Sequence, residues 1–281
     1  MNNDLGRTNA PARGESREPR AVRAAPAGAP GRLPFAAPPP PAPEPRPAEA
    51  LNGPLNNRLL SALPAEDFSR LFPHLEPVSL AAGEVLYKLD AEMRHAYFPE
   101  TAVVSHVYIL SEGGMTESDM VGREGMTGLT AVFDVPAPSY VTEVALAGSA
   151  LRARVDVLRQ EFARGGAFQR LLLRYTQALL TQMSQTAVCN RLHAIEQQLC
   201  RWLLLSHDRL GSDELVMTQE LIANMLGVRR EGVTAAAGRL QERGLIGYSR
   251  GRIRILDRRG LEEAACECYG VVRGEYDRLL G

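Results

Sequence analysis

The stretch TQELIANMLGVRREGVTAAAGRLQERGLIGYSRGRIRIL, residues 218–256, holds two short helical patterns followed by a strand–turn–strand pattern. Gly227 lies between the helical patterns, at a position where a left-handed residue commonly ends a helix. Thr218 can cap the first helix, because its hydroxyl can accept a hydrogen bond from a free amide one turn later. This order predicts a winged helix-turn-helix, whose second helix can enter a DNA major groove.

The second helix of this motif is expected over residues 230–243. Its inward face carries apolar residues at helical spacing: Val233, Ala236, Ala237 and Leu240. Its outward N-terminal end carries four polar residues that we expect to read bases: Arg229, Arg230, Glu231 and Thr234. Arginine can form two hydrogen bonds with guanine, and glutamate can accept one from the amino group of cytosine.

The wing is expected as two strands, residues 245–248 and 252–256, around a turn at 249–251. From Arg229 to Arg259 there are nine arginines and three acidic residues, a net charge of +6, whereas the whole chain has −1. A local positive patch of this kind suits contacts with phosphate. The expected phosphate-contacting residues are Thr218, Gln219, Arg250, Arg252 and Arg254.

Composition divides the rest of the chain. Residues 1–50 hold twelve of the nineteen prolines and few large apolar residues, so we expect a disordered tail rich in Pro, Ala and Arg. Residues 51–160 are expected to form a sensor-like domain, 161–190 a dimerisation helix and 191–281 the DNA-binding domain. The chain has no secretory signal pattern and no apolar run long enough to span a membrane, so a cytoplasmic protein is expected.

The predicted fold class is α+β. After a short helical entry, apolar stretches broken by Gly, Pro, Asp and Ser run from Gly83 to about Leu151 and are typical of an antiparallel β-roll. A long helix is expected from Phe162 to about Asn190. Its coiled-coil-like seam, which we expect to form the dimer contact, consists of Phe168, Leu172, Tyr175, Leu179 and Met183.

The order of a roll, a long helix and a winged helix-turn-helix resembles the Crp–Fnr family. The resemblance covers residues 55–261 and is strongest at AGEVLY (Ala82–Tyr87) and at VRREGV in the second helix of the motif. It implies a homodimeric transcription regulator with a cyclic-nucleotide-binding-like roll. It also implies that Arg230 and Glu231 contact a G·C pair in each half of a palindrome-like DNA site. RNA polymerase is a further candidate partner.

The roll departs from the relatives that bind cyclic nucleotides. Those relatives use a Gly-Glu pair for the ribose and an Arg-Ser pair for the phosphate, but here Leu129 stands at the position of the Glu and Ser139-Tyr140 at the Arg-Ser pair. No Lys or Arg lies between Arg123 and Arg152, so a buried phosphate would lack a charged partner. We therefore expect no control by cyclic AMP or cyclic GMP at that site.

The sequence gives little support for a metal site or a bound cofactor, so we expect neither. Cys266 and Cys268 form a C-x-C pair, but two thiolates do not make a four-ligand site, and Cys189 and Cys200 are interpreted as packing residues. Three histidines offer candidate haem ligands and are interpreted as surface or hydrogen-bonded residues: His74, His95 and His106. The acids around Gly113-Gly114 are interpreted as a solvated hairpin: Glu112, Glu117 and Asp119.

The leading hypothesis is therefore a sequence-specific DNA-binding regulator that is not an enzyme. Two alternatives stay open. In one, an unidentified small effector, such as an apolar metabolite, binds beside Leu129 and Tyr140 in the roll and gates DNA binding. In the other, the proline-rich arm recruits a protein partner, and the helix-turn-helix is vestigial.

Overall fold

The computed structural model describes residues 55–135 and 137–281, all within one compact unit. The proline-rich tail expected at residues 1–50 lies outside the described residues. In the described part of the chain, no helix is both long and apolar enough to cross a membrane.

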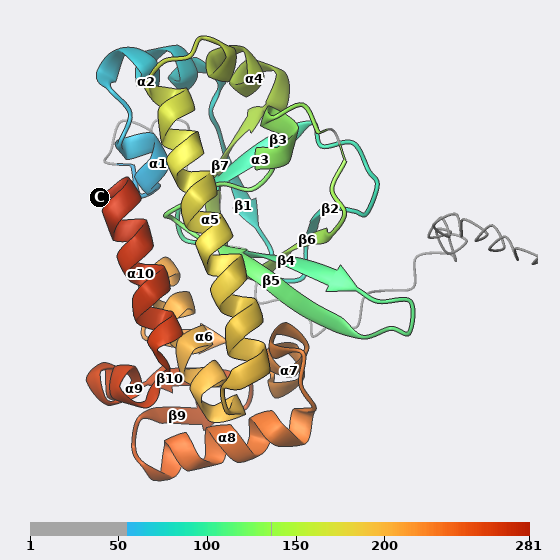
Figure 1. Ribbon diagram of the computed structural model, residues 1–281, viewed down its shortest axis with the longest axis vertical. Coiled ribbons are helices and arrows are strands. Elements are labelled where there is room, and N and C mark those ends of the chain that lie inside the picture. Colours follow the sequence, from blue (N-terminus) through green and yellow to red (C-terminus); the bar gives the residue numbers. More distant parts are fainter. Residues whose placement is uncertain (1–54, 136) are drawn as a thin grey trace, which may run out of the picture. The chain divides into compact units, whose positions relative to one another are not determined.

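Two antiparallel sheets form the roll (Figure 1). The first has the strand order β1-β7-β3 and the second the order β2-β6-β4-β5. The strands are β1 (Glu76–Leu80), β2 (Val85–Tyr87), β3 (His95–Pro99), β4 (Val103–Ile109), β5 (Met115–Val121), β6 (Val141–Leu146) and β7 (Gly148–Arg154). Short helices precede the roll or interrupt it: α1 (Arg58–Ser61), α2 (Ala65–Leu71), η2 (Phe72–His74) and α3 (Leu129–Val132). This arrangement confirms the expected antiparallel roll.

Strand β5 corrects one expectation from the sequence. The acids Glu117 and Asp119 do not lie in a solvated hairpin: both are buried, with exposed fractions of 6% and 2%. Polar residues dominate this strand, so it lacks the apolar alternation by which a strand is usually recognised. Its polar side chains form hydrogen bonds with buried partners, as described below.

The predicted long helix is in fact two helices, α4 (Val155–Ala163) and α5 (Ala167–Leu192). Between them Gly165 has a φ of +74°, a left-handed conformation that glycine adopts without steric cost. The expected start at Phe162 was therefore wrong, because that residue belongs to the end of α4. Helix α5 runs beside the roll and towards the C-terminal region (Figure 1).

The C-terminal region contains the helix-turn-helix and its wing. Its elements are α6 (Ile195–Leu210), β8 (Glu214–Val216), α7 (Gln219–Leu226), α8 (Arg230–Glu242), β9 (Ile246–Ser249), β10 (Arg252–Ile255), α9 (Arg258–Ala264) and α10 (Glu267–Leu280). Strand β8, which the sequence analysis missed, joins the wing in a sheet of order β8-β10-β9. Helix α10 packs along α5, so the end of the described chain returns to the long helix (Figure 1).

Candidate nucleic-acid interface

The turn between α7 and α8 forms as the sequence predicts. The hydroxyl of Thr218 accepts a hydrogen bond from the amide of Leu221 at 3.2 Å and caps α7. Gly227 ends that helix with a φ of +65°. Helix α8 then begins at Arg230, with Arg229 as its N-cap residue.

Helix α8 buries its apolar face and exposes the predicted base-reading residues. The four apolar residues expected to face inward are all buried: Val233, Ala236, Ala237 and Leu240. The four predicted base-reading residues are all exposed: Arg229, Arg230, Glu231 and Thr234. Thr234 Oγ1 lies 2.7 Å from Gln219 Oε1 and 3.0 Å from the carbonyl oxygen of Arg230. The first residue of α7 is thereby held against the start of α8.

The wing places a further arginine at its tip. Arg250 and Gly251 have φ values of +50° and +75°, so the chain reverses tightly between β9 and β10. Along β10, Arg252 and Arg254 are exposed, whereas the two isoleucines are buried. Cross-strand pairing places Arg254 opposite Glu214 of β8. The Glu214 carboxylate bonds to Arg252 and lies 3.4 Å from Arg254 Nη2.

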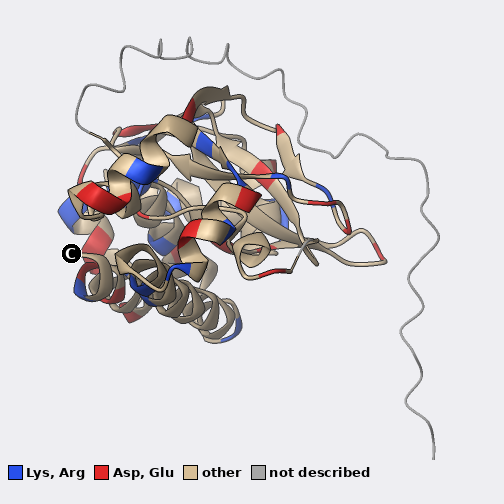
Figure 2. Ribbon diagram, turned by 90° about the horizontal axis from the view of Figure 1, so that it is seen from above, with Lys and Arg blue, Asp and Glu red and all other residues tan. Residues whose placement is uncertain are grey.

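Carboxylates partner most of the arginines in this region, and basic and acidic residues are interspersed along the described chain (Figure 2). Arg239 and Arg243 share Glu196, at 2.6 Å and 2.9 Å. Arg258 and Arg259 each have an acidic partner within α9. Within the described residues, three arginines of the +6 segment have no ion-pair partner: Arg229, Arg230 and Arg250. They lie at the start of α8 and at the tip of the wing, where a duplex would approach.

Comparisons with known proteins agree with this geometry. Residues 197–264 match the family model of the Crp-like helix-turn-helix domain. FixK2 from Bradyrhizobium japonicum is 18% identical, with a TM-score of 0.57 over 68% of this chain and 98% of that one. A protein from Eubacterium rectale assigned to the crp/fnr family of transcriptional regulators is 19% identical, with a TM-score of 0.54 over 73% and 96%. The c-di-GMP-responsive regulator CLP of Xanthomonas campestris is 14% identical, with a TM-score of 0.54 over 68% and 99%.

Residues 197–264 therefore form a Crp-like helix-turn-helix domain, and the chain shares its fold with Crp–Fnr regulators. The helix-turn-helix match carries this conclusion, and the solved structures show the shared fold. The comparison with curated proteins gave no significant match.

Helix α5 corrects the predicted dimer seam. Phe168, Leu172 and Tyr175 are buried within their own chain, and the Tyr175 hydroxyl donates to the carbonyl oxygen of Met126 at 2.9 Å. They are therefore core residues and cannot contact a second copy. Leu179 is half-buried against the same core, and Met183 is half-buried. An outward stripe at heptad spacing remains: Leu173, Thr176, Leu180, Met183 and Ala187.

The interior of the roll is filled by a hydrogen-bonded network. The ring of His106 lies between Asp119 Oδ2, 2.7 Å from its Nδ1, and Thr127 Oγ1, 2.8 Å from its Nε2. Its ring centroid is 4.5 Å from that of Tyr140. Glu143 is also buried, and its Oε2 has no hydrogen-bond partner among the described residues. Burial raises the pKa of Glu143 to about 8.

These residues do not fit the cyclic nucleotide that some members of the family bind. Between residues 76 and 154 the buried polar side chains include five acids but no Lys or Arg. Gly128 has a φ of +87°, and a Cβ there would meet the Tyr87 hydroxyl at 2.6 Å, so this side chain fills the space beneath it. Arg159 reaches α3 from α4, but it bonds to Ala131 O and lies 3.1 Å from Asp134. A cyclic phosphate would therefore meet carboxylates without a free cation.

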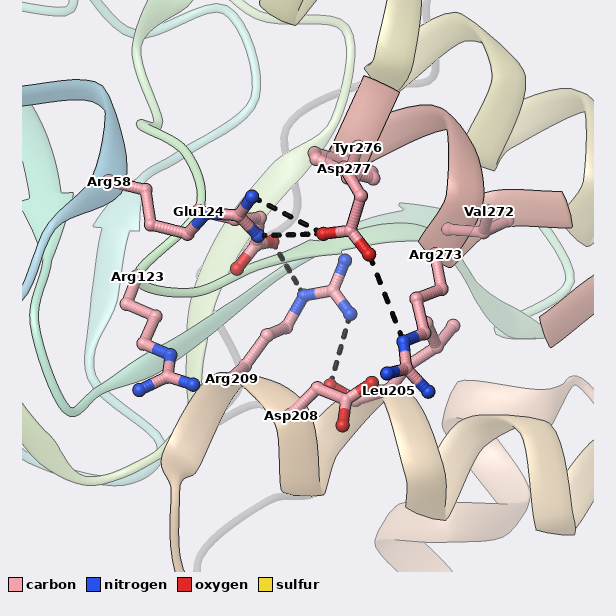
Figure 3. A pocket seen from close by; sticks show the side chains of 10 residues that line it. All are labelled: Arg58, Arg123, Glu124, Leu205, Asp208, Arg209, Val272, Arg273, Tyr276 and Asp277. Atoms are coloured by element: carbon pink, nitrogen blue, oxygen red, sulfur yellow. Dashed lines mark hydrogen bonds and ion pairs between the residues drawn. The ribbon is translucent and has the colours of Figure 1, made fainter. Parts of the chain in front are cut away.

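A cavity of about 210 Å³ lies where α6 and α10 meet the roll (Figure 3). Arg209 and Glu124 form a buried ion pair on its wall, with 2.6 Å between Nε and Oε1. Arg58 and Arg273 approach Asp277 at 3.3 Å and 3.9 Å. Three of the four arginines that line the cavity are thus already paired. We interpret it as a polar junction between the roll and the C-terminal region.

Sequence reasoning missed two sets of residues. One is the contact between α6 and the roll, where Trp202 Nε1 donates to Glu117 Oε1 at 3.1 Å. The other is a group of three cysteines and one histidine near the end of α5. In the sequence, Cys266 and Cys268 form a C-x-C pair, but their spacing does not show that they approach Cys189 and His193. The spacing of four between Cys189 and His193, one helical turn, was the available signal.

Proposed function

We propose that this protein binds a palindrome-like duplex site as a homodimer, with Arg230 and Glu231 reading base edges in each half-site. The observation that carries the proposal is the set of arginines at the start of α8 and the wing tip that have no acidic partner among residues 55–135 and 137–281. An arginine without a carboxylate partner can bind guanine or phosphate without first breaking an ion pair. Arg229 and Thr234 flank the two central residues and assist them.

Phosphate contacts are assigned to the wing and to the start of α7. Arg250 at the wing tip is free to bind phosphate directly. Arg252 and Arg254 share Glu214 in the free protein, and phosphate would have to compete with that carboxylate for them. Thr218 and Gln219 lie at the N-terminus of α7, where backbone amides and the helix dipole favour an anion.

The homodimer is assigned to the outward stripe of α5. Leu173 and Leu180 are seven residues apart and each is 52% exposed. A second copy of the same helix would cover both leucines, and a two-fold dimer places two copies of α8 about one helical turn apart on DNA. We place this dimer in the cytoplasm, with RNA polymerase as a further partner and without control by cyclic AMP.

Selection of genomic fragments tests the proposal. Purified protein is incubated with sheared genomic DNA in excess random competitor, and the retained fragments are sequenced. The expected result is one enriched motif with two-fold symmetry, protected in a footprint. Failure to enrich any fragment, even at low salt, contradicts the proposal.

Arg230→Ala tests the base-reading assignment. We expect specific binding to weaken by about 1–3 kcal/mol and discrimination to relax at one base pair per half-site. Arg239→Ala is the matched control, because Arg239 lies on the same helix but pairs with Glu196. Fluorescence anisotropy with the selected site and with variants at each base pair measures both. An unchanged preference in Arg230→Ala contradicts the assignment.

A second candidate function keeps the roll as a sensor for a ligand other than a cyclic nucleotide monophosphate. CLP, which shares the fold, is c-di-GMP-responsive. In the roll, Glu143 Oε2 has no hydrogen-bond partner among the described residues, and the ring of Tyr140 lies beside that of His106, so a ligand could bind there. DNA affinity measured with and without a small-molecule cell extract distinguishes a gated regulator from a constitutive one.

A further inference from the structure

Four metal-binding side chains converge where α5 ends and α10 begins. They are Cys189, His193, Cys266 and Cys268, and their ligand atoms all lie within 4.8 Å of one another. Cys189 lies in the last turn of α5 and His193 caps it, whereas Cys266 caps α10 and Cys268 lies in its first turn. Three of the four are buried, and His193 is half-buried. Two segments more than 70 residues apart in sequence thus supply two ligands each.

The spacing of these atoms fits a single tetrahedral ion. Cys189 Sγ lies 3.5 Å from Cys266 Sγ, and Cys268 Sγ lies 3.5 Å from His193 Nδ1. With Zn–S bonds of about 2.3 Å and Zn–N bonds of about 2.0 Å, tetrahedral geometry separates two sulfurs by about 3.8 Å and a sulfur from a nitrogen by about 3.5 Å. The cysteines are free thiols, and a disulfide would need a sulfur separation of about 2.05 Å. An iron–sulfur cluster would hold its ligands further apart, because several iron and sulfide ions lie between them.

The surroundings also suit a metal bound by thiolates. His193 Nε2 lies 3.5 Å from Glu267 Oε1, and a carboxylate at the second ring nitrogen is the usual partner of a metal-binding histidine. The buried Arg201 interacts electrostatically with Cys189 and Cys268. One Zn²⁺ with three thiolates and a neutral imidazole carries a charge of −1, which this arginine balances.

We propose that Cys189, His193, Cys266 and Cys268 bind one structural Zn²⁺ that fixes the end of α5 to the start of α10. All four tetrahedral positions are filled by protein ligands, which is the pattern of a structural and not a catalytic zinc. The ion would hold α5, which carries the exposed leucine stripe, against α10. The site depends on the geometry of these four residues alone, so it can fail without contradicting the proposed DNA binding.

Metal content of the full-length wild-type chain is the first test. Protein purified under reducing conditions is analysed for zinc, iron and acid-labile sulfide, and its metal-free form is titrated with Co²⁺. The expected results are one equivalent of zinc per chain and, with Co²⁺, the visible bands of tetrahedral coordination together with thiolate-to-metal charge transfer. These readouts require neither DNA nor a variant.

Matched cysteine variants locate the ion. Cys268→Ser and Cys189→Ser should lose the zinc and the charge-transfer band, whereas Cys200→Ala should keep both, because Cys200 is buried but lies outside the group. His193→Ala should weaken Co²⁺ binding at least about tenfold and shift the visible bands. Chelation should lower the melting temperature of the wild type and of Cys200→Ala, but not that of Cys268→Ser.

Four outcomes overturn the proposal. They are a wild type that carries no zinc and gives no tetrahedral Co²⁺ spectrum, the presence of iron with acid-labile sulfide, equal loss of metal in Cys200→Ala, and a Cys189–Cys266 disulfide in the reduced preparation. If the Cys268→Ser chain fails to fold, the metal analysis and the Co²⁺ spectrum of the wild type still test the proposal.

Discussion

Arginines in the DNA-binding region differ in whether they must break an ion pair with a carboxylate before they can bind DNA. Arg230 and Arg250 have no acidic partner within the described residues, whereas Arg252 and Arg254 share Glu214. Hydrogen bonds from these two arginines lower the pKa of Glu214, so its carboxylate is charged at neutral pH. The count of arginines in the sequence therefore overstates the positive charge that the free wing offers to phosphate.

Glu214→Gln should raise affinity for every duplex tested by about two- to fivefold, because phosphate would no longer compete with a carboxylate for the wing arginines. Anisotropy titrations over a range of salt concentrations measure the change on specific and random DNA. Glu263→Gln is the control, since it removes an exposed acid that pairs with Arg259 outside the wing. Equal effects of the two variants, or a gain on the specific site alone, would contradict this role for Glu214.

Glu117 should make stability depend on pH. Burial raises its pKa from 4.5 to about 7, with a nearby Asp119 adding to the shift and Arg201 opposing it. Because the folded state holds this proton more tightly than the unfolded state, the contribution to stability is complete below pH 4.5 and is lost as pH rises through about 7. Urea unfolding across pH 4–8 measures this loss.

Trp202 reports the same titration directly. It is the single tryptophan of the chain and donates to Glu117 at 3.1 Å, so its emission should change with a midpoint near pH 7. Glu117→Gln should abolish this transition, and Glu143→Gln should retain it. A Glu117→Gln protein that titrates like the wild type would show that another group causes the change.

Among the elements, helix α5 has two apolar faces that lie in different surroundings. One face packs into the core through Leu172 and Tyr175, and the other presents Leu173 and Leu180 outward. The sequence shows that this helix is apolar on more than one side. Its pattern does not decide which side faces the chain's own core, because both sides have heptad spacing. Burial in the folded chain resolves this ambiguity.

Leu180→Glu should separate the dimer into monomers of 30.7 kDa, weakening the dimer at least about tenfold, because each copy would bury a carboxylate in the contact. Leu110→Glu is the control, since Leu110 is 60% exposed beyond the end of β4 and away from α5. Analytical ultracentrifugation measures the mass over a range of concentrations. If the Leu180→Glu protein remains as dimeric as the control, the outward stripe of α5 is not the dimer contact.

Local signals explain which elements the sequence predicts well. Caps such as Thr218 and Gly227 act within a few residues, so the bounds of α7 and α8 follow from the sequence. Strand β5 was missed because its acids find partners on β4 and on α6. The cysteine–histidine group was missed for a similar reason, because its ligands meet only after α10 folds back on α5.

At the scale of the whole molecule, α6 connects the DNA-binding region to the roll through buried polar contacts. Arg209 on α6 bonds to Glu124 of the roll and, through Nη2, to Gln182 of α5 at 2.7 Å. The Tyr276 ring of α10 lies 5.7 Å from the same guanidinium. One buried arginine thus joins the roll, the long helix and the last helix, so a change in the roll could reach the helix-turn-helix through it.

Arg209→Ala should destabilise the fold by about 3–5 kcal/mol, because Glu124 would be left as a buried charge without its partner. The double variant Arg209→Met/Glu124→Met should recover much of this loss, since it removes both charges and keeps similar volume. Chemical unfolding measures stability, and limited proteolysis reports whether the C-terminal region separates from the roll. A single variant that costs under about 1 kcal/mol would show that the pair has little part in joining them.

Strand β8 precedes the helix-turn-helix yet lies in the wing sheet, hydrogen-bonded to β10. This pairing anchors the hairpin to the segment that leads into α7, so the wing and the motif form a preorganised scaffold. DNA would then meet a surface whose backbone is already ordered, and association would lose little chain entropy. Hydrogen–deuterium exchange in the wing should accordingly be slow before any duplex is added.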